Sequence, residues 1–325
     1  MVQSAWTLAR NTFTETIRQP IYGVILLTTA ALLILNVSLA GFTLDDDDKL
    51  LLDLGLSTLL LSGLFLSAFS AAGVVSREIE NKTVLTVVSK PVARPVFILG
   101  KFAGLLAALV LAFYLSFLVF LLAQRHGVLE RTSDPWDAPV LVFGFASLAL
   151  SFLAAGFCNY FYGWGFPATT LVFITPMLTA SVLAISILDE HWNFIPFASN
   201  FVGGQIILAT YLVLLTIIIM AAVALAASTR FGQVMTLLIC TAVLGLGISS
   251  DYAFGQSEEA VRWASIAYRA VPNLGMFWVI DGLTADSERT TISAAYLLYT
   301  SAYAMLITTG VLGIAVASFQ KREVG

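Results

Sequence analysis

The sequence is dominated by apolar stretches that are each long enough to cross a lipid bilayer. A bilayer core of about 30 Å is crossed by about 20 helical residues, and runs of that length recur along the whole chain. Of the 325 residues, 59% are hydrophobic and 11% are charged, and mean hydropathy is +0.91. Within a bilayer no water satisfies the backbone, so such segments are helical or belong to a closed barrel. Barrel strands would alternate apolar and polar residues, which these runs do not.

The sequence therefore predicts an all-α polytopic integral membrane protein with about eight transmembrane helices. The predicted spans lie at about 21–42, 50–75, 97–123, 138–158, 166–188, 203–228, 231–249 and 292–318. Together, residues 21–325 form a single transmembrane domain.

Residues 1–20 predict a separate amphipathic helix. Trp6, Ala9, Phe13 and Ile17 recur at helical spacing, and most polar side chains fall elsewhere. This pattern is typical of a helix that lies in the membrane interface. The alternative is that these residues only flank the first span.

The distribution of charge predicts the orientation. Positive residues concentrate on the cytoplasmic side of membrane proteins. With eight crossings and a cytoplasmic N-terminus, 10 of the 16 bases lie inside and 16 of the 20 acids lie outside. We therefore expect a multi-pass protein of the cell (inner or plasma) membrane with both termini in the cytoplasm. Loop 76–95 then faces the cytoplasm, and segment 250–290 faces the other side.

The stretch "SREIENKTVLTVVSKPVARPVFILGK", residues 76–101, is the densest mixture of charge and proline in the chain. It predicts a short helix with Ser76 as its cap and Glu78 and Lys82 as an i,i+4 pair. Pro91 ends this helix, and Pro95 suits the first turn of the next span. Two interpretations stay open: a docking surface for a cytoplasmic partner, or a positive loop that only fixes topology.

Parts of the sequence resemble the permeases of ABC transporters of the ABC-2 family. Residues Glu78-Ile79, Thr83, Ser89, Pro91-Val92, Arg94 and Gly100-Lys101 are similar to the cytoplasmic coupling segment of that family. The stretch "ALAASTRFGQVMTL" resembles its short inner turn between two late helices, and "AYRAVPNLGMFWVIDGL" resembles the region before its last span. The six-helix core of the family would leave 138–158 and 166–188 as an added hairpin.

This resemblance implies an exporter subunit that is driven by a separate ATPase. ATP and Mg would be bound by that partner, because no phosphate-binding loop surrounds Gly100-Lys101. The implied partners are cytoplasmic ABC ATPase subunits, a second permease copy or a related permease, and the lipid bilayer; no nucleic acid is expected. The residues implied to meet the ATPase are Arg77, Glu78, Ile79, Glu80, Lys82, Leu85, Val88 and Arg94. The candidates for an extracytoplasmic gate, in a re-entrant or interfacial segment, are Tyr268, Pro272, Asn273 and Trp278.

Few residues favour chemistry within this chain. The sequence Asp189-Glu190-His191 could supply metal ligands, although a polar cap on a helix is the simpler interpretation because metal sites use three or four ligands. The spans carry almost no ionisable residues, which disfavours proton-coupled transport and intramembrane catalysis. Lys101, near a helix end, is expected to reach water by snorkelling.

Three alternatives stay open. A rival function is a non-transporting membrane scaffold or assembly subunit related to such permeases. Gly100-x-x-x-Gly104 and Ala68-x-x-x-Ala72 are either a dimer seam or chance matches in a chain rich in small residues. The run Asp45-Asp46-Asp47-Asp48-Lys49 is expected to be an outer turn, with cation attraction as the alternative. The substrate is not fixed by the sequence.

Overall fold

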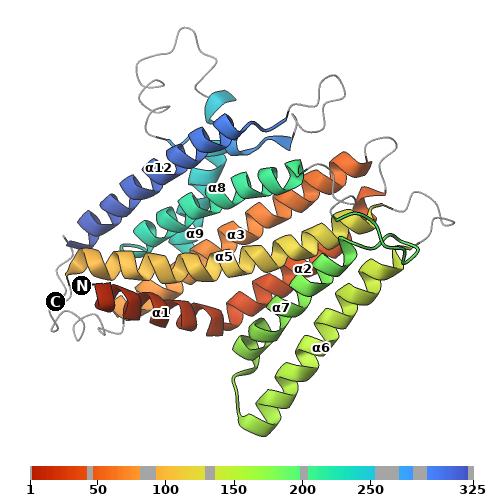
Figure 1. Ribbon diagram of the computed structural model, residues 1–325. Coiled ribbons are helices and arrows are strands. Elements are labelled where there is room, and N and C mark those ends of the chain that lie inside the picture. Colours follow the sequence, from red (N-terminus) through yellow and green to blue (C-terminus); the bar gives the residue numbers. More distant parts are fainter. Residues whose placement is uncertain are drawn as a thin grey trace. The chain divides into compact units, whose positions relative to one another are not determined.

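The computed structural model describes residues 2–41, 47–80, 93–128, 136–197, 204–252, 271–280 and 291–320 (Figure 1). These residues are 85% helical and form no strands, so the predicted all-α fold class is confirmed for the described part of the chain. The helices are α1 (Val2–Arg18), α2 (Pro20–Ala40), α3 (Asp47–Glu80), α5 (Arg94–His126), α6 (Ala138–Tyr162), α7 (Phe166–Ile185), α8 (Gln205–Ser228), α9 (Gln233–Ile248) and α12 (Ala294–Gln320), with the 3-10 turn η2 (Gly275–Phe277).

Within the described residues, seven helices are long and apolar enough to cross a membrane: α2, α3, α5, α6, α7, α8 and α12. The remaining predicted span, 231–249, corresponds to α9, which has 16 residues. At 1.5 Å per residue α9 is about 24 Å long, shorter than a bilayer core of about 30 Å. The structure therefore supports a multi-pass membrane protein with seven helices of spanning length.

Helix α3 differs from its prediction at both ends. It begins at Asp47, so that Asp47 and Asp48 lie in its first turn, where carboxylates are favoured by the partial positive charge of the helix N-terminus. The predicted outer turn at 45–49 is thus wrong for its last three residues. Helix α3 also continues through Ser76 to Glu80. Ser76 is therefore inside a helix and is not the cap of a separate one.

The described chain forms two compact units. Unit 1 contains residues 1–16, 63–110 and 208–325, and unit 2 contains residues 17–62 and 111–207. Helices α3 and α5 contribute residues to both units.

Helix α8 is the core of unit 1. Its residues from Ala209 to Ser228 are mostly buried, including Leu212, Ile217 and Met220. Gly63 of α3 provides room for it, because a Cβ at this position would lie 2.3 Å from the Ile217 side chain. An apolar helix that is buried on most sides is typical of the centre of a helical bundle.

The α6–α7 pair is a helical hairpin in unit 2. Its connection holds Gly163 in the left-handed conformation (φ +67°), and Pro167 lies in the first turn of α7, as expected for a glycine that ends one helix and a proline that starts the next. The Ser181 hydroxyl donates to the Phe143 carbonyl at 3.0 Å, linking α7 to α6. The hairpin packs on α5 through a cluster that includes Leu118, Leu122 and Val182.

Candidate functional site

The structure describes only part of the predicted coupling segment. Arg77, Glu78, Ile79 and Glu80 lie in the last turn of α3, and their side chains are outside the described part. Lys82, Leu85 and Val88 lie outside the described residues altogether. Arg94 is described and is the first residue of α5.

Arg94 holds the C-terminal end of α12. Its Nη1 donates to the carbonyl oxygen of Gln320, the last residue of α12, at 2.6 Å. Arg230, just after α8, donates from Nη2 to the carbonyl of Ser318 at 3.1 Å. The last carbonyls of a helix have no partner within the helix and carry partial negative charge. Two cationic side chains therefore stabilise this helix end and join it to α5 and α8.

Helix α1 packs closely on the first turns of α5 because two glycines face it. A Cβ on Gly104 would lie 2.2 Å from the carbonyl oxygen of Ala9 and 2.7 Å from the Cβ of Thr12. A Cβ on Gly100 would lie 2.9 Å from the Cβ of Leu8. The Gly100-x-x-x-Gly104 motif is therefore filled by α1 of the same chain. The interpretation of this motif as a dimer seam is wrong.

Lys101 lies in the same region and is buried. Its residue is 3% exposed, its Nζ lies 3.9 Å from the Glu15 carboxylate of α1, and it lies 5.7 Å from the centre of the Phe97 ring. The Phe97 ring in turn stacks on the ring of Phe319 of α12, with 5.4 Å between the ring centres. The prediction that Lys101 reaches water is wrong, because the neighbouring helices cover it and supply a carboxylate and an aromatic face instead.

We call this region, formed by α1, Arg94, Lys101, Arg230 and the end of α12, the basic end of unit 1. Sequence reasoning missed that α1 belongs to it through its small residues. Of the predicted apolar residues Trp6, Ala9, Phe13 and Ile17, Ala9 is in the contact with the two glycines of α5, and the other contacting residues are Ala5, Leu8 and Thr12. Trp6 itself is 70% exposed. The small residues of α1 and the two glycines of α5 were the sequence signal from which this contact could have been predicted.

The candidate gate residues lie in segment 271–280. The Asn273 N–H donates to the Tyr303 hydroxyl at 2.8 Å, and its side-chain amide donates to Asp251 Oδ1 at 2.8 Å. The N–H of Leu274 donates to the carbonyl of Gly247 at 2.9 Å, and Leu274 is buried. The segment is thereby held between the C-terminal end of α9 and the first half of α12.

Pro272 and Trp278 are the other described candidates in this segment. The Pro272 carbonyl would lie 2.9 Å from a Cβ on Gly247, so glycine is required at that position of α9. Trp278 is half-buried, and Phe277 beside it is buried against Tyr303. Tyr268 lies outside the described residues. The structure thus brings three of the four candidates together in one segment.

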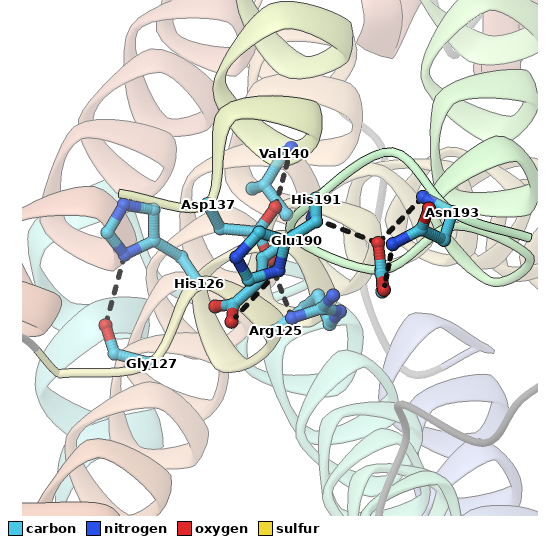
Figure 2. A network of polar contacts seen from close by, with 9 residues as sticks. Arg125, His126, Gly127, Asp137, Val140, Glu190, His191 and Asn193 are labelled. Atoms are coloured by element: carbon cyan, nitrogen blue, oxygen red, sulfur yellow. Dashed lines mark hydrogen bonds and ion pairs between the residues drawn. The ribbon is translucent and has the colours of Figure 1, made fainter. Parts of the chain in front are cut away.

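A second polar network lies in unit 2 (Figure 2). Arg125, at the end of α5, forms an ion pair with Asp137, with 2.6 Å between Nη1 and Oδ2. Asp137 also caps α6, because its Oδ1 accepts from the Val140 N–H at 3.2 Å. The pair is largely buried and fixes the start of α6 against the end of α5.

The Asp189-Glu190-His191 sequence forms a turn after α7. The Asp189 carboxylate accepts from the Asn193 side chain at 3.0 Å and from the backbone N–H groups of Asn193 and His191. These hydrogen bonds, that of the Asn193 side chain first, lower the pKa of Asp189 below its ordinary value. His191 pairs with Glu190 at 3.5 Å. Across the described ranges, no three His, Cys, Asp or Glu side chains are grouped so as to hold a metal ion.

Compared with known proteins, the chain matches no family model and no curated protein.

Proposed function

We propose that this chain is the membrane-spanning permease subunit of an ATP-driven exporter of the ABC-2 type. In this proposal a separate ATPase binds ATP and Mg, docks on the cytoplasmic segment 76–95 and moves the helices that begin there. The chain acts with a second copy of itself or with a related permease. The substrate crosses the membrane when the ATPase closes.

The observation that carries the proposal is the way the basic end connects the coupling segment to three other helices. Arg94 lies at the end of the coupling segment, as the first residue of α5, and is hydrogen-bonded to the end of α12. The first turns of α5 are packed on α1 without space for a methyl group at Gly104. A force applied to segment 76–95 therefore reaches α1, α5 and α12 together, because tightly packed helices move as a body rather than deforming.

Helix α5 is suited to carry such a movement through the membrane. It is continuous from Arg94 to His126, 33 residues, which is about 50 Å of helix. Displacement of its first turn is therefore coupled to its far end.

The proposal also includes the path of the chain through the membrane. We propose eight crossings, with α9 as a short span, so that both termini lie in the cytoplasm. Helix α1 then lies in the inner interface, the α6–α7 hairpin is an addition to a six-helix core, and segment 271–280 is a re-entrant element that closes the outer end of the path. The hydrogen bonds of Asn273 with Asp251 and Tyr303 support a closed state of this element.

The test uses an ABC-type ATPase purified from the same organism, reconstituted with the full chain in lipid nanodiscs. We expect the chain to bind the ATPase and to change its rate of ATP hydrolysis. Glu78→Lys should weaken binding by roughly tenfold or more, because reversing a charge at an interface opposes complementary charges on the partner. Arg230→Gln should leave binding intact but reduce the response of ATP hydrolysis to the chain, because the end of α12 is no longer joined to the end of α8. Lys49→Gln is the control, since Lys49 is an exposed base at the other end of α3.

The outcomes separate the proposal from the rival function. Binding of the ATPase with a hydrolysis rate that does not depend on the chain would favour a scaffold or assembly subunit. Equal behaviour of Glu78→Lys and Lys49→Gln would contradict the assignment of the coupling segment.

A further inference from the structure

An elongated apolar groove lies within unit 2, and no residue of segment 271–280 lines it. Its volume is about 520 Å³, and it is lined by residues of α2, α5, α6 and α7 and by Ile17 at the end of α1. Along α2 its lining residues run from Pro20 to Ser38, a distance of about 27 Å at 1.5 Å per residue. The groove is therefore long and narrow.

The groove exists because small residues stand where larger side chains would fill it. Gly23 of α2 and Gly144 of α6 both line it. A Cβ on Gly23 would meet nothing within 4 Å, and a Cβ on Gly144 would meet only Leu122, at 3.7 Å. Ser147 also lines it, but its hydroxyl donates to the Gly144 carbonyl within α6. The walls are consequently apolar even at this hydroxyl.

The two ends of the groove differ in polarity. Pro20, Phe166 and Pro167 line one end, whereas His126 and Trp136 line the other. Trp136 is 64% exposed. Its ring lies edge-on to the His126 ring, with 6.0 Å between the ring centres. The neighbours of these two residues in the chain, Arg125 and Asp137, form the ion pair described above (Figure 2). Exposed tryptophan beside charged groups is typical of the level at which lipid headgroups lie.

We propose that this groove binds one acyl chain of a bilayer phospholipid, with the headgroup at the His126 and Trp136 end. The volume lies within the range of about 300–1,000 Å³ of sites for a single small ligand, and the length and apolar walls fit one hydrocarbon chain. The surrounding spans are open to lipid: only 22% of the apolar windows of α2 and α6, and 33% of that of α7, is buried. A lipid chain can therefore enter from the bilayer. This inference does not depend on the proposed function.

The test is photocrosslinking of the full chain in nanodiscs that contain a phosphatidylcholine with a diazirine on one acyl chain. Peptide mapping should place the label on α2, α5 and α6 lining residues in preference to exposed positions of α12 such as Met305 and Leu306. These two residues are 72% and 70% exposed, so they report contact with bulk lipid.

The matched variants are Gly144→Phe and Gly156→Phe, on the same helix. Both positions are half-buried and leave room for a side chain, but Gly156 does not line the groove. Gly144→Phe should reduce labelling of the groove by roughly tenfold or more, because a phenyl ring takes the space of several methylene groups. Gly156→Phe should leave it unchanged. Gly23→Phe, from the opposite wall, repeats the test if Gly144→Phe does not fold.

Three results would overturn the proposal. The first is labelling that is equal on α12 and on the groove. The second is groove labelling that persists in both folded Phe variants. The third is labelling by a diazirine fatty acid that an excess of phosphatidylcholine does not compete away, since the occupant would then be a single-chain amphiphile and not a bilayer lipid.

Discussion

Two glycines on α5 determine how closely α1 can approach it. At Gly104 the space for a side chain is already filled by the Ala9 carbonyl and by Thr12, and Gly100 faces Leu8 in the same way. The consequence is a contact between α1 and α5 that has no room for adjustment. Such contacts move as one, which is the property that the proposed coupling requires.

We predict that Gly104→Ala destabilises the protein although alanine is the better helix former. The added methyl group overlaps the backbone of α1, and overpacking costs about 1–3 kcal/mol. Gly310→Ala on α12 is the control, because a Cβ there meets nothing within 4 Å, and it should be neutral or stabilising by up to about 1 kcal/mol. The measurement is the free energy of unfolding in detergent. Equal effects of the two substitutions would contradict the described packing of α1.

Residues in this contact could be identified from the sequence only in part. The Gly100-x-x-x-Gly104 motif was recognisable, but its partner was not, because small-residue motifs accept any helix with a matching stripe. Lys101 illustrates a second limit. A charge one turn inside a span usually reaches water along its own side chain, and only the position of α1 and Phe97 shows that it is covered instead.

At the level of elements, the α6–α7 hairpin depends on how α6 is started. Asp137 accepts the Val140 N–H and pairs with Arg125, so that one carboxylate both begins α6 and ties it to α5. This arrangement positions α6 as a wall of the lipid groove. It also explains why Asp137 is buried rather than exposed.

Asp137→Asn should lower the free energy of unfolding by about 3 kcal/mol, because asparagine can still cap the helix but leaves the Arg125 charge unpaired in a buried place. Glu190→Gln is the comparison. Its ion pair with His191 is exposed, and such surface pairs contribute less than about 1 kcal/mol. Urea titration in micelles measures both variants. A loss for Glu190→Gln as large as that for Asp137→Asn would show that the buried pair has no special role.

The spanning helices were predictable because length and apolarity are set by the bilayer. The positions at which these helices begin and end were harder to predict. Helix α3 extends past Ser76 to Glu80, although residues 76–80 are mostly polar and lie beyond the apolar run. The burial of Leu274 and Phe277 was not predictable either, because Trp, Tyr and Phe near a membrane surface usually indicate an interfacial anchor. Only the hydrogen bonds of Asn273 and Leu274 show that the segment is held by α9 and α12.

For the whole molecule, the number of crossings determines which side each terminus faces. Seven helices have spanning length, and α9 is shorter. If α9 crosses, Lys321 and Arg322 lie on the same side as Arg10, in agreement with the excess of bases expected inside. A short helix can cross where the bilayer thins locally, at a modest cost in free energy.

Reporter fusions test this parity. A fluorescent protein that folds only in the cytoplasm should fluoresce at the C-terminus and at the α8–α9 turn, residues 229–232. Alkaline phosphatase should be inactive at these two sites and active when it is fused directly after Asp251. A C-terminal fusion that reports the outer compartment would mean an odd number of crossings, and α9 would then not span the membrane.

The account depends most directly on which compartment the coupling segment faces, because ATP is available only in the cytoplasm. The measurement is labelling of Lys82→Cys with a membrane-impermeant maleimide in intact and in permeabilised cells, with Lys49→Cys as the reference for the other side. The native thiols Cys158 and Cys240 are buried and give a low background. We predict that Lys82→Cys reacts only after permeabilisation and that Lys49→Cys reacts in intact cells. Reaction of Lys82→Cys in intact cells would contradict the account.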